Sequence, residues 1–334
     1  MIISRTPFRI SFFGGGTDFP EWYEENGGGV ISASIDRYCY ISCRYLPPFF
    51  EHKHRIVYSI IENTKNYHEI KHPSVKAVLS RLKQEEGVEI HHNADLPARS
   101  GLGSSSSFTV GLLHALLALR GQQTEPKQLS REAIHIEREI IQEVVGCQDQ
   151  IAAAYGGFNT ITFQKNYNHK VIPIIVDKER LNVLQHNLML YFTGFSRYAT
   201  EIESCKVKNF SMKKNILQTI HSMVGEAASI ISNPKIPLDE FGKLLDEAWQ
   251  CKKGLSDKVS LPEIDYMYES AKKAGAKGGK ILGAGGGGFL LLYADSKAQI
   301  RIREELKNYI RVTFGFERKG SQIVLYKPDC FDAK

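Results

Sequence analysis

The residues best suited to chemistry lie in a serine- and glycine-rich segment about 100 residues into the chain. It reads Pro97-Ala98-Arg99-Ser100-Gly101-Leu102-Gly103-Ser104-Ser105-Ser106-Ser107 and runs directly into an apolar stretch. Glycines let main-chain N–H groups approach a ligand closely, and a helix beginning there adds unpaired N–H donors and partial positive charge. Serine hydroxyls can donate to phosphate or bind magnesium. The segment predicts a phosphate-binding loop, although it has no Walker A lysine and the serines could simply cap the helix.

Two further glycine-rich segments have the composition of turns that pass close to a ligand or to another segment. Leu282-Gly283-Ala284-Gly285-Gly286-Gly287-Gly288 precedes a short apolar strand, where four consecutive glycines are entropically costly. Near the N-terminus, a strand carrying Arg9 leads into Gly14-Gly15-Gly16-Thr17-Asp18. The carboxylate of Asp18 could accept hydrogen bonds from sugar hydroxyls. Tight turning alone is the alternative for the glycines, and helix capping is the alternative for Asp18.

The elements that must position these segments are strands and helices without strict alternation, which predicts an α+β fold. Ser105–Leu119 is apolar on every side, as in a helix buried in a core. Ser130–Val145 carries an apolar stripe at helical spacing, and Glu137 falls within that stripe. A carboxylate there needs a partner, and a Lys or Arg side chain could provide one.

The remaining elements follow from alternation, apolar runs and turn residues. Strands are expected at Ile2–Arg5, Arg9–Phe13, Gly29–Ile35, Tyr38–Tyr45, Arg55–Ile61, Val88–Asn93, Phe158–Phe163, Lys170–Ile175, Asn187–Phe192, Phe289–Tyr293 and Ser321–Tyr326. Further helices are expected at Ser74–Glu86, Ile202–Ser232 with breaks, Leu238–Cys251, Pro262–Lys273 and Lys297–Tyr309. A chain of 334 residues favours two domains.

Composition and charge narrow the class of protein. With 42% hydrophobic and 24% charged residues, the chain is typical of a soluble globular protein. The net charge of +6 favours anionic ligands only weakly, and an ordinary surface balance also explains it. Basic residues are spread rather than clustered with aromatic ones, so no nucleic acid is expected. The absence of a signal peptide, a long apolar run and any CxxC pair among six cysteines predicts a cytoplasmic protein without membrane, zinc or disulfides. The oligomeric state stays open.

Together and in this order, the three glycine-rich segments resemble the GHMP kinase superfamily, which includes galactokinase, homoserine kinase, mevalonate kinase and phosphomevalonate kinase. Pro97–Ser107 is similar to the family's P-x-x-x-G-L-G-S-S loop, Leu282–Gly288 to its C-terminal glycine motif and Thr6–Asp18 to its N-terminal one. The resemblance implies a ribosomal S5 domain 2-like domain over residues 1–175 and a ferredoxin-like domain over residues 176–334. ATP would lie between them.

The resemblance also implies roles for single residues. The ATP phosphates would lie over Gly101, Leu102, Gly103, Ser104, Ser105 and Ser106. Glu137, which stands 12 residues before Asp149, would hold Mg²⁺ together with Ser104 or Ser105. Cys147-Gln148-Asp149-Gln150 stands where galactokinase-like enzymes have Met-Asp-Gln, so Asp149 would accept the acceptor proton or orient its hydroxyl. Arg9 would stabilise the carboxylate of Asp149. A capping role is the alternative for Asp149.

The substrate is inferred from departures within the same motifs. Gly14–Asp18 lacks the Glu and His of the galactokinase ending Gly-Glu-His-Thr-Asp, which argues against galactose. Arg5–Pro20, Thr193–Arg197 and Lys280–Phe289 are most similar to D-glycero-D-manno-heptose 7-phosphate kinases. That branch implies phosphorylation of the anomeric C1 hydroxyl, giving a 1,7-bisphosphate in nucleotide-activated heptose biosynthesis. The expected substrate contacts are Arg9, Gly15, Gly16, Thr17, Asp18, Asp149, Arg197, Gly285, Gly286 and Gly287.

Arg197 is the candidate cation for the phosphate that this substrate already bears, with an ordinary surface arginine as the alternative. Two alternatives to the heptose phosphate kinase also remain open. One is a fucokinase-like or other anomeric sugar kinase, and the other is a sugar sensor with a GHMP fold and no kinase activity.

Overall fold

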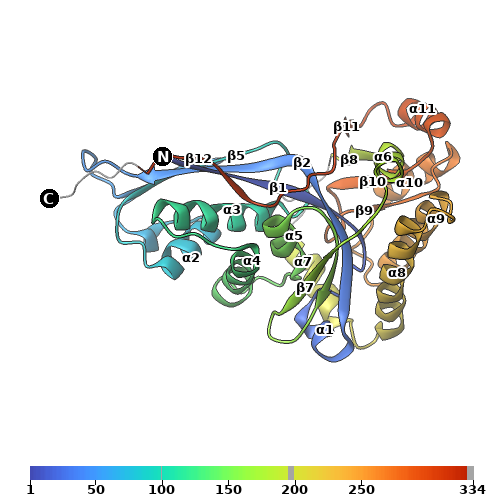
Figure 1. Cartoon of the computed structure of the whole chain (residues 1–334), viewed down its shortest axis with the longest axis horizontal. Helices are drawn as coiled ribbons and strands as arrows, with labels where there is room; N and C mark the ends of the chain where they lie inside the picture. The colour runs from blue at the N-terminus through green and yellow to red at the C-terminus, as the bar shows by residue number, and fades with distance from the viewer. Residues whose placement is uncertain (99, 195–198, 329–334) are drawn as a thin grey trace.

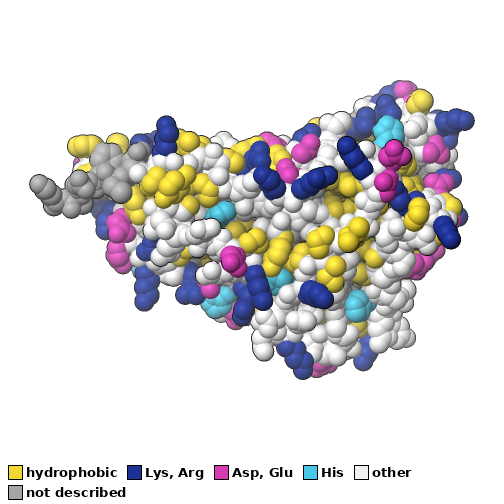
Figure 2. Space-filling model, in the orientation of Figure 1, with side chains coloured by type: hydrophobic (Ala, Val, Ile, Leu, Met, Phe, Trp, Pro, Cys, Tyr) yellow, Lys and Arg dark blue, Asp and Glu magenta, His cyan; other side chains and the backbone are white. Residues whose placement is uncertain are grey.

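The computed structural model describes residues 1–98, 100–194 and 199–328 of the chain. Figure 1 shows an elongated molecule, with a long sheet and its helices over most of the length and a second sheet with helices at the other end. On the face shown in Figure 2, Lys and Arg side chains are interspersed with Asp and Glu side chains along the whole molecule. The mixed strand and helix content confirms the predicted α+β class.

Two long strands form the centre of the first, eight-stranded sheet. They are β1 (Ile2–Phe13) and β2 (Gly28–Tyr45), which pair antiparallel over most of their length. The sequence predicted two separate strands in each stretch. Each is instead one strand, because a register shift between Pro7 and Phe8 leaves Asp36 and Arg37 of β2 unpaired while both strands continue. β1 therefore carries Arg9 and runs without interruption into the turn that begins at Gly14.

The other strands extend this sheet on both sides of β1 and β2. Its order is β12-β1-β2-β5-β3-β4, with β6 pairing with both β2 and β7. Their bounds are β3 (His54–Val57), β4 (Ile61–Thr64), β5 (Val88–Ala94), β6 (Phe158–Phe163), β7 (His169–Pro173) and β12 (Gln322–Tyr326). The predicted strand Arg55–Ile61 is therefore a hairpin of two short strands, because a turn separates Val57 from Ile61.

One helix, α3 (Ser104–Leu119), lies directly against β1 and β2. It is covered in turn by α2 (Pro73–Leu82), α4 (Pro126–His135) and α5 (Gln148–Tyr155), which lie on the same side of the sheet in Figure 1. Val110, Leu112 and Leu116 of α3 are fully buried. The prediction of a core helix is therefore confirmed, and its N-terminus is fixed under the middle of the sheet.

The predicted helix Ser130–Val145 is wrong at both ends. The α-helix begins earlier, since Pro126 occupies its first turn, and it ends at His135. A single π-helical turn, η2 (Ile136–Ile140), follows, in which the N–H of Ile141 donates to the carbonyl of Ile136 at 2.9 Å. The chain is irregular from there to Cys147. This wide turn is local structure that the apolar spacing did not reveal, and it contains Glu137.

The second sheet has four antiparallel strands in the order β11-β8-β10-β9. They are β8 (Leu188–Phe192), β9 (Gly278–Ile281), β10 (Phe289–Tyr293) and β11 (Ile310–Val312). Helices follow β8 and separate β10 from β11, which gives the β-α-β-β-α-β arrangement of a ferredoxin-like fold, as predicted. The accompanying helices are α6 (Lys178–His186), α7 (Ala199–Lys208), α8 (Lys214–Ser232), α9 (Asp239–Lys253), α10 (Pro262–Lys273) and α11 (Ser296–Glu305).

The two sheets are joined by aromatic packing and by the last described strand. Phe12 and Phe13 at the end of β1 lie 5.5 and 5.2 Å, between ring centroids, from Phe241 of α9. After β11 the chain returns to the first sheet, where β12 pairs with β1. The division into domains at residue 175 stays a prediction, but the strand pairing places residues 322–326 with the first sheet. The remaining elements are α1 (Pro20–Asn26) and η1 (Tyr67–Glu69). Over the described residues, the helices are too short or too polar to cross a bilayer.

Candidate active site

A bidentate ion pair joins β1 to the first turn of α5. The Nε and Nη2 atoms of Arg9 donate to Oδ1 and Oδ2 of Asp149 at 2.7 and 2.8 Å. The third guanidinium nitrogen, Nη1, donates to the carbonyl oxygen of Gly101 at 2.7 Å. The side chain of Arg9 is 3% exposed, whereas that of Asp149 is 24% exposed. The arginine therefore holds the carboxylate in one orientation while Asp149 stays accessible to a ligand.

The N-terminus of α3 lies against this ion pair. Gly103 precedes the helix in the left-handed region, with φ of 74°. A Cβ atom on Gly103 would lie 3.3 Å from Oδ2 of Asp149 and 3.4 Å from Cγ of Arg9. The first turn of α3 is therefore close to the carboxylate, and a helix N-terminus is a position whose N–H groups can bind an anion. The structure brings together the predicted phosphate loop and the predicted catalytic pair.

Glu137 lies beneath the first turn of α3 and is 1% exposed. Its Oε2 accepts hydrogen bonds from Oγ of Ser106, at 2.8 Å, and from Nε2 of Gln150. Its Oε1 has no hydrogen-bond partner. Burial raises the pKa of Glu137 to about 7, and the hydrogen bonds from Ser106 and Gln150 offset only part of this rise. A buried carboxylate with one unpartnered oxygen fits a cation such as Mg²⁺.

A serine outside the predicted metal-binding set contacts Glu137. Ser106 donates a hydrogen bond to this carboxylate, because it points to the buried side of α3 while Ser105 is exposed. Metal binding by Ser104 or Ser105 together with Glu137 stays a prediction. Glu137 and Asp149 both lie at the start of α3, as the resemblance implied.

The C-terminal glycine segment packs against the phosphate loop. A Cβ atom on Gly101 would lie 2.4 Å from the carbonyl oxygen of Leu282, and one on Gly283 would lie 2.4 Å from Cα of Gly101. A Cβ atom on Gly288 would lie 2.2 Å from the carbonyl oxygen of Ser100. These glycines are therefore required where two loops touch, which is one of the two explanations that the sequence left open. Gly285, Gly286 and Gly287 all have positive φ, at 108°, 71° and 151°.

The N-terminal turn divides the predicted substrate residues into two groups. The Thr17 hydroxyl is fully buried and lies 2.8 Å from the carbonyl oxygen of Gly14, so it stabilises the turn. A Cβ atom on Gly16 would contact Leu217 at 3.3 Å. A Cβ atom on Gly15 would meet only Ser11 Oγ and Gln148 Nε2, at 3.8 and 3.9 Å. Substrate contact by the side chain of Thr17 is therefore not supported, while Gly15 is partly exposed and has room for a small side chain.

Asp18 is also turned toward the fold. Its Oδ1 accepts the N–H of Gly16 at 2.9 Å, and a Cβ atom on Gly146 would lie 1.9 Å from its Oδ2. Burial raises the pKa of Asp18 to about 6, and the negative charges of Asp149 and Glu203 raise it further, whereas the Gly16 hydrogen bond lowers it. Asp18 therefore stabilises the turn at Gly16, but it does not cap a helix, because the N-cap of α1 is Phe19 and no side chain caps that helix.

Two stretches of the chain match family models. Residues 70–157 match the GHMP kinases N terminal domain and residues 232–311 match the GHMP kinases C terminal model, together about half of the chain. The chain belongs to the GHMP kinases. The first match includes the start of α3, Glu137 and Asp149, and the second includes Gly283–Gly288. The resemblance inferred from the sequence is thus confirmed, and the protein is a phosphotransferase.

Individual relatives extend over almost the whole kinase. A D-glycero-alpha-D-manno-heptose 7-phosphate kinase of Campylobacter jejuni is 29% identical, over 96% of this chain and 97% of its own. A bifunctional fucokinase/GDP-fucose pyrophosphorylase of Arabidopsis thaliana is 25% identical over 91% of this chain, which spans only 31% of that protein. The crystal structure of a D-glycero-D-manno-heptose 1-phosphate kinase from Bacteroides thetaiotaomicron superposes with a TM-score of 0.78 at 23% identity, covering 96% of this chain and 98% of that one. The last likeness shows a shared fold.

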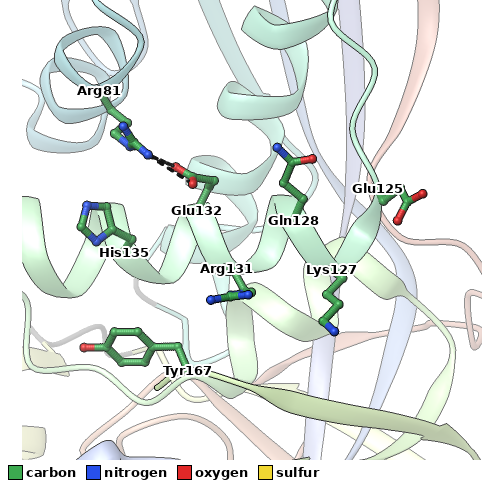
Figure 3. A pocket seen from close by; sticks show the side chains of 8 residues that line it. All are labelled: Arg81, Glu125, Lys127, Gln128, Arg131, Glu132, His135 and Tyr167. Atoms are coloured by element: carbon green, nitrogen blue, oxygen red, sulfur yellow. Dashed lines mark hydrogen bonds and ion pairs between the residues drawn. The ribbon is translucent and has the colours of Figure 1, made fainter. Parts of the chain in front are cut away.

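A surface hollow of about 550 Å³ lies elsewhere on the kinase. Figure 3 shows the side chains that line it. Its lining residues are Arg81, Glu125, Lys127, Gln128, Arg131, Glu132, His135 and Tyr167. It opens on the solvent side of α4, opposite the buried Leu129 and Ala133. Arg81 and Glu132 in this hollow are already paired with each other, at 3.0 Å. None of the lining residues belongs to the site at the start of α3, so the hollow is separate from that site.

Some site residues were missed by the sequence interpretation. Gln150, which donates to Glu137, was quoted only as part of a motif. Two lysines, Lys252 and Lys280, are buried beside the C-terminal glycine segment. The position of Lys280 directly before a glycine-rich turn was the one available signal for it. Arg197, the predicted cation for the substrate phosphate, lies outside the described residues.

Proposed function

We propose that this kinase transfers the γ-phosphoryl group of ATP to the anomeric hydroxyl of D-glycero-D-manno-heptose 7-phosphate, forming the 1,7-bisphosphate. The observation that carries the proposal is the Arg9–Asp149 pair at the N-terminus of α3, which joins an oriented carboxylate to an anion-binding helix end. The choice of acceptor is supported by the heptose 7-phosphate kinase that aligns over 96% of the chain.

In the proposed reaction, Asp149 positions the acceptor hydroxyl and takes up its proton. The acceptor oxygen forms a bond to the γ-phosphorus, the bond from that phosphorus to the β,γ-bridging oxygen breaks, and ADP leaves with the electron pair. Arg9 keeps both oxygens of Asp149 oriented and also fixes the carbonyl of Gly101. Phosphoryl transfer depends mainly on such positioning and on charge stabilisation.

The start of α3 supplies the charge stabilisation for ATP. The N–H groups from Gly101 to Ser106 would donate to the phosphates and offset the negative charge that develops during transfer. Glu137 is the carboxylate that would hold Mg²⁺, with hydroxyls of the serine loop completing the protein's share of the ligands. When bound, Mg²⁺ neutralises phosphate charge and orients the β- and γ-phosphates.

A second candidate is an anomeric kinase for an unphosphorylated sugar such as L-fucose, which is favoured by the 25% identity to the fucokinase-containing relative. The arrangement of Asp149 and Glu137 at one helix end favours either kinase over a sensor without catalysis.

The decisive experiment is an ATP- and Mg²⁺-dependent assay with heptose 7-phosphate, free heptose, L-fucose and galactose as acceptors. Heptose 7-phosphate should give the highest kcat/KM, and ³¹P NMR should place the new phosphate on C1. Efficient turnover of fucose or galactose alone would favour the second candidate. A new phosphate at any position other than C1 would contradict the proposed regiochemistry.

A further inference from the structure

Two buried lysines beside the catalytic pair end against backbone carbonyls. Lys280 of β9 is 5% exposed, and its Nζ donates to the carbonyl of Phe12 at 2.8 Å. Lys252 of α9 is 8% exposed, and its Nζ donates to the carbonyls of Ile281 and Gly283 at 2.8 and 2.6 Å. Within the described part of the chain, neither ammonium group forms an ion pair with a carboxylate. Buried cations without an anion are unfavourable, so this region is suited to an anionic ligand.

A third buried lysine, Lys206 of α7, lies close to the other two. We refer to Lys206, Lys252 and Lys280 as the lysine cluster. Burial lowers the pKa of Lys280 to about 7, and the nearby positive charges of Arg9 and Lys206 lower it further. Burial, followed by repulsion from Lys280 and Lys206, lowers the pKa of Lys252 as well. The mutual repulsion shows that these cations share one region.

Nearby carboxylates do not compensate the charge of the lysine cluster. Arg9 is neutralised by its own ion pair, and Lys206 is paired with Glu203 at 2.7 Å. Asp18 is then the carboxylate that remains to act on Lys280. Each ammonium group has three N–H donors, and Lys280 has one hydrogen-bond partner among the described residues. Donors and positive charge are therefore left over for a ligand.

The position of Lys280 places these unused N–H donors and this positive charge beside the N-terminal glycine turn, where the acceptor sugar is expected. Phe12, which accepts the hydrogen bond from Lys280, lies two residues before the turn that begins at Gly14. In that turn Gly15 is partly exposed, and the buried hydroxyl of Ser11 beside it has no hydrogen-bond partner. The ATP phosphates are expected instead at the start of α3.

We propose that the lysine cluster binds the phosphate group that the acceptor sugar already carries, with Lys280 as its main ligand. This inference rests on the proposed function, since it identifies what selects a phosphorylated over a free sugar. A phosphate monoester has three terminal oxygens and about two negative charges, which matches several ammonium donors around one point. Hydrogen bonds to backbone carbonyls already fix the positions of the Lys252 and Lys280 ammonium groups. These side chains therefore lose little conformational entropy when a ligand binds.

The test compares Lys280→Met with wild-type enzyme on two acceptors, heptose 7-phosphate and free heptose. Methionine keeps an unbranched side chain that is one atom shorter, and it removes the charge. Losing a hydrogen bond to a charged group should lower kcat/KM for the 7-phosphate about 10- to 100-fold, mainly through KM. The value for free heptose should change less than about threefold by the same reasoning. The control is Lys277→Met, which removes a lysine near β9 that pairs at the surface with Asp239 and should leave both values unchanged.

An equal loss on both acceptors would overturn the proposal, because Lys280 would then serve only to hold the end of β1. A 7-phosphate value that stays the same in Lys280→Met would overturn it too. Inorganic phosphate provides a measurement that does not depend on the identity of the sugar. It should compete with the acceptor in the wild-type enzyme, and Lys280→Met should weaken this inhibition at least about tenfold.

The choice of heptose 7-phosphate as substrate and the binding of phosphate by the lysine cluster can be tested separately. If the wild-type enzyme does not prefer the 7-phosphate over free sugars, the proposed substrate is wrong, but differential inhibition by inorganic phosphate would still support an anion site at the lysine cluster. If phosphate inhibits wild-type and Lys280→Met enzymes alike, the lysine proposal is wrong even where the 7-phosphate is the preferred substrate. Should Lys280→Met fold poorly, proton uptake by the wild-type protein on binding phosphate at pH 8 gives the same decision. Uptake is expected because an anion favours the charged lysine, and its absence would contradict the proposal.

Discussion

Glu137 offers the sharpest test of how the site is built, because its buried carboxyl should make the stability of the protein depend on pH. Its pKa is raised from 4.5 to about 7 in the folded protein, mainly by burial. A carboxyl with a raised pKa in the folded state favours folding less as pH rises, since the unfolded chain loses this proton first. The contribution is lost between pH 4.5 and 7, and it stays lost above pH 7 in the absence of a bound cation.

The perturbation is Glu137→Gln, which keeps the shape and removes the titration. Between pH 5 and pH 8 the wild-type protein should lose about 2.5 kcal/mol of unfolding free energy relative to the variant, from 1.36 kcal/mol per pKa unit. Urea unfolding at both pH values measures this, and the difference between the two proteins cancels groups such as Asp18 that titrate in both. Any constant offset from the buried amide also cancels in that comparison.

An identical pH dependence in wild-type protein and Glu137→Gln would refute the reasoning. It would mean that the carboxyl of Glu137 is already ionised at pH 5 in the folded protein, through water or a cation that compensates its burial. In the same preparations, Mg²⁺ should promote ATP binding by the wild-type kinase and have a much smaller effect on the variant. Equal Mg²⁺ dependence would contradict the proposed metal role.

Asp149→Ala should bind ATP with wild-type affinity and lose turnover by about 100-fold or more, as expected for a group that activates the acceptor. Asp149→Asn can still accept a hydrogen bond from Arg9, and it should lose turnover by a similar factor if the negative charge matters. Wild-type turnover in either variant would contradict this role of Asp149. Gly15→Ala should fold normally but raise KM for the acceptor, because its Cβ would occupy space beside Ser11 without a clash. Its matched control Gly14→Ala should cost about 3 kcal/mol or more, measurable by thermal melting, since a Cβ there would lie 1.9 Å from the carbonyl oxygen of Gly29 at a φ of 84°. Similar melting temperatures for these two variants would contradict the geometry of the turn.

Local sequence determined much of this kinase. The apolar run after Ser104 fixes a buried helix, because a segment without a polar face can be stable in water only inside a core. The serines and glycines ahead of it predict a helix start that can bind an anion, for reasons of local backbone geometry. The bounds of α10 were predicted to the residue, since Pro262 and a final pair of lysines mark its ends. The motifs also identified Arg9, Glu137 and Asp149 as the charged residues of interest.

Tertiary structure decided which of these groups meet and in what state. Arg9 and Asp149 are 140 residues apart in the chain, and only the packing of α5 against β1 brings them into a bidentate pair. The side of α3 that faces Glu137 selected Ser106 as its partner, which spacing alone did not reveal. The glycines of the two loops are explained by mutual backbone contact, a property of two distant segments.

The lysine cluster shows the limit of sequence most clearly. In the sequence, Lys206, Lys252 and Lys280 look like any of the 43 basic residues, which usually lie on the surface. Burial between α7, α9 and β9 is what makes their charges exceptional, because the desolvation of an ion depends on everything packed around it. The residue types that do chemistry can thus be read from the chain, while their neighbours, burial and protonation are set by the fold.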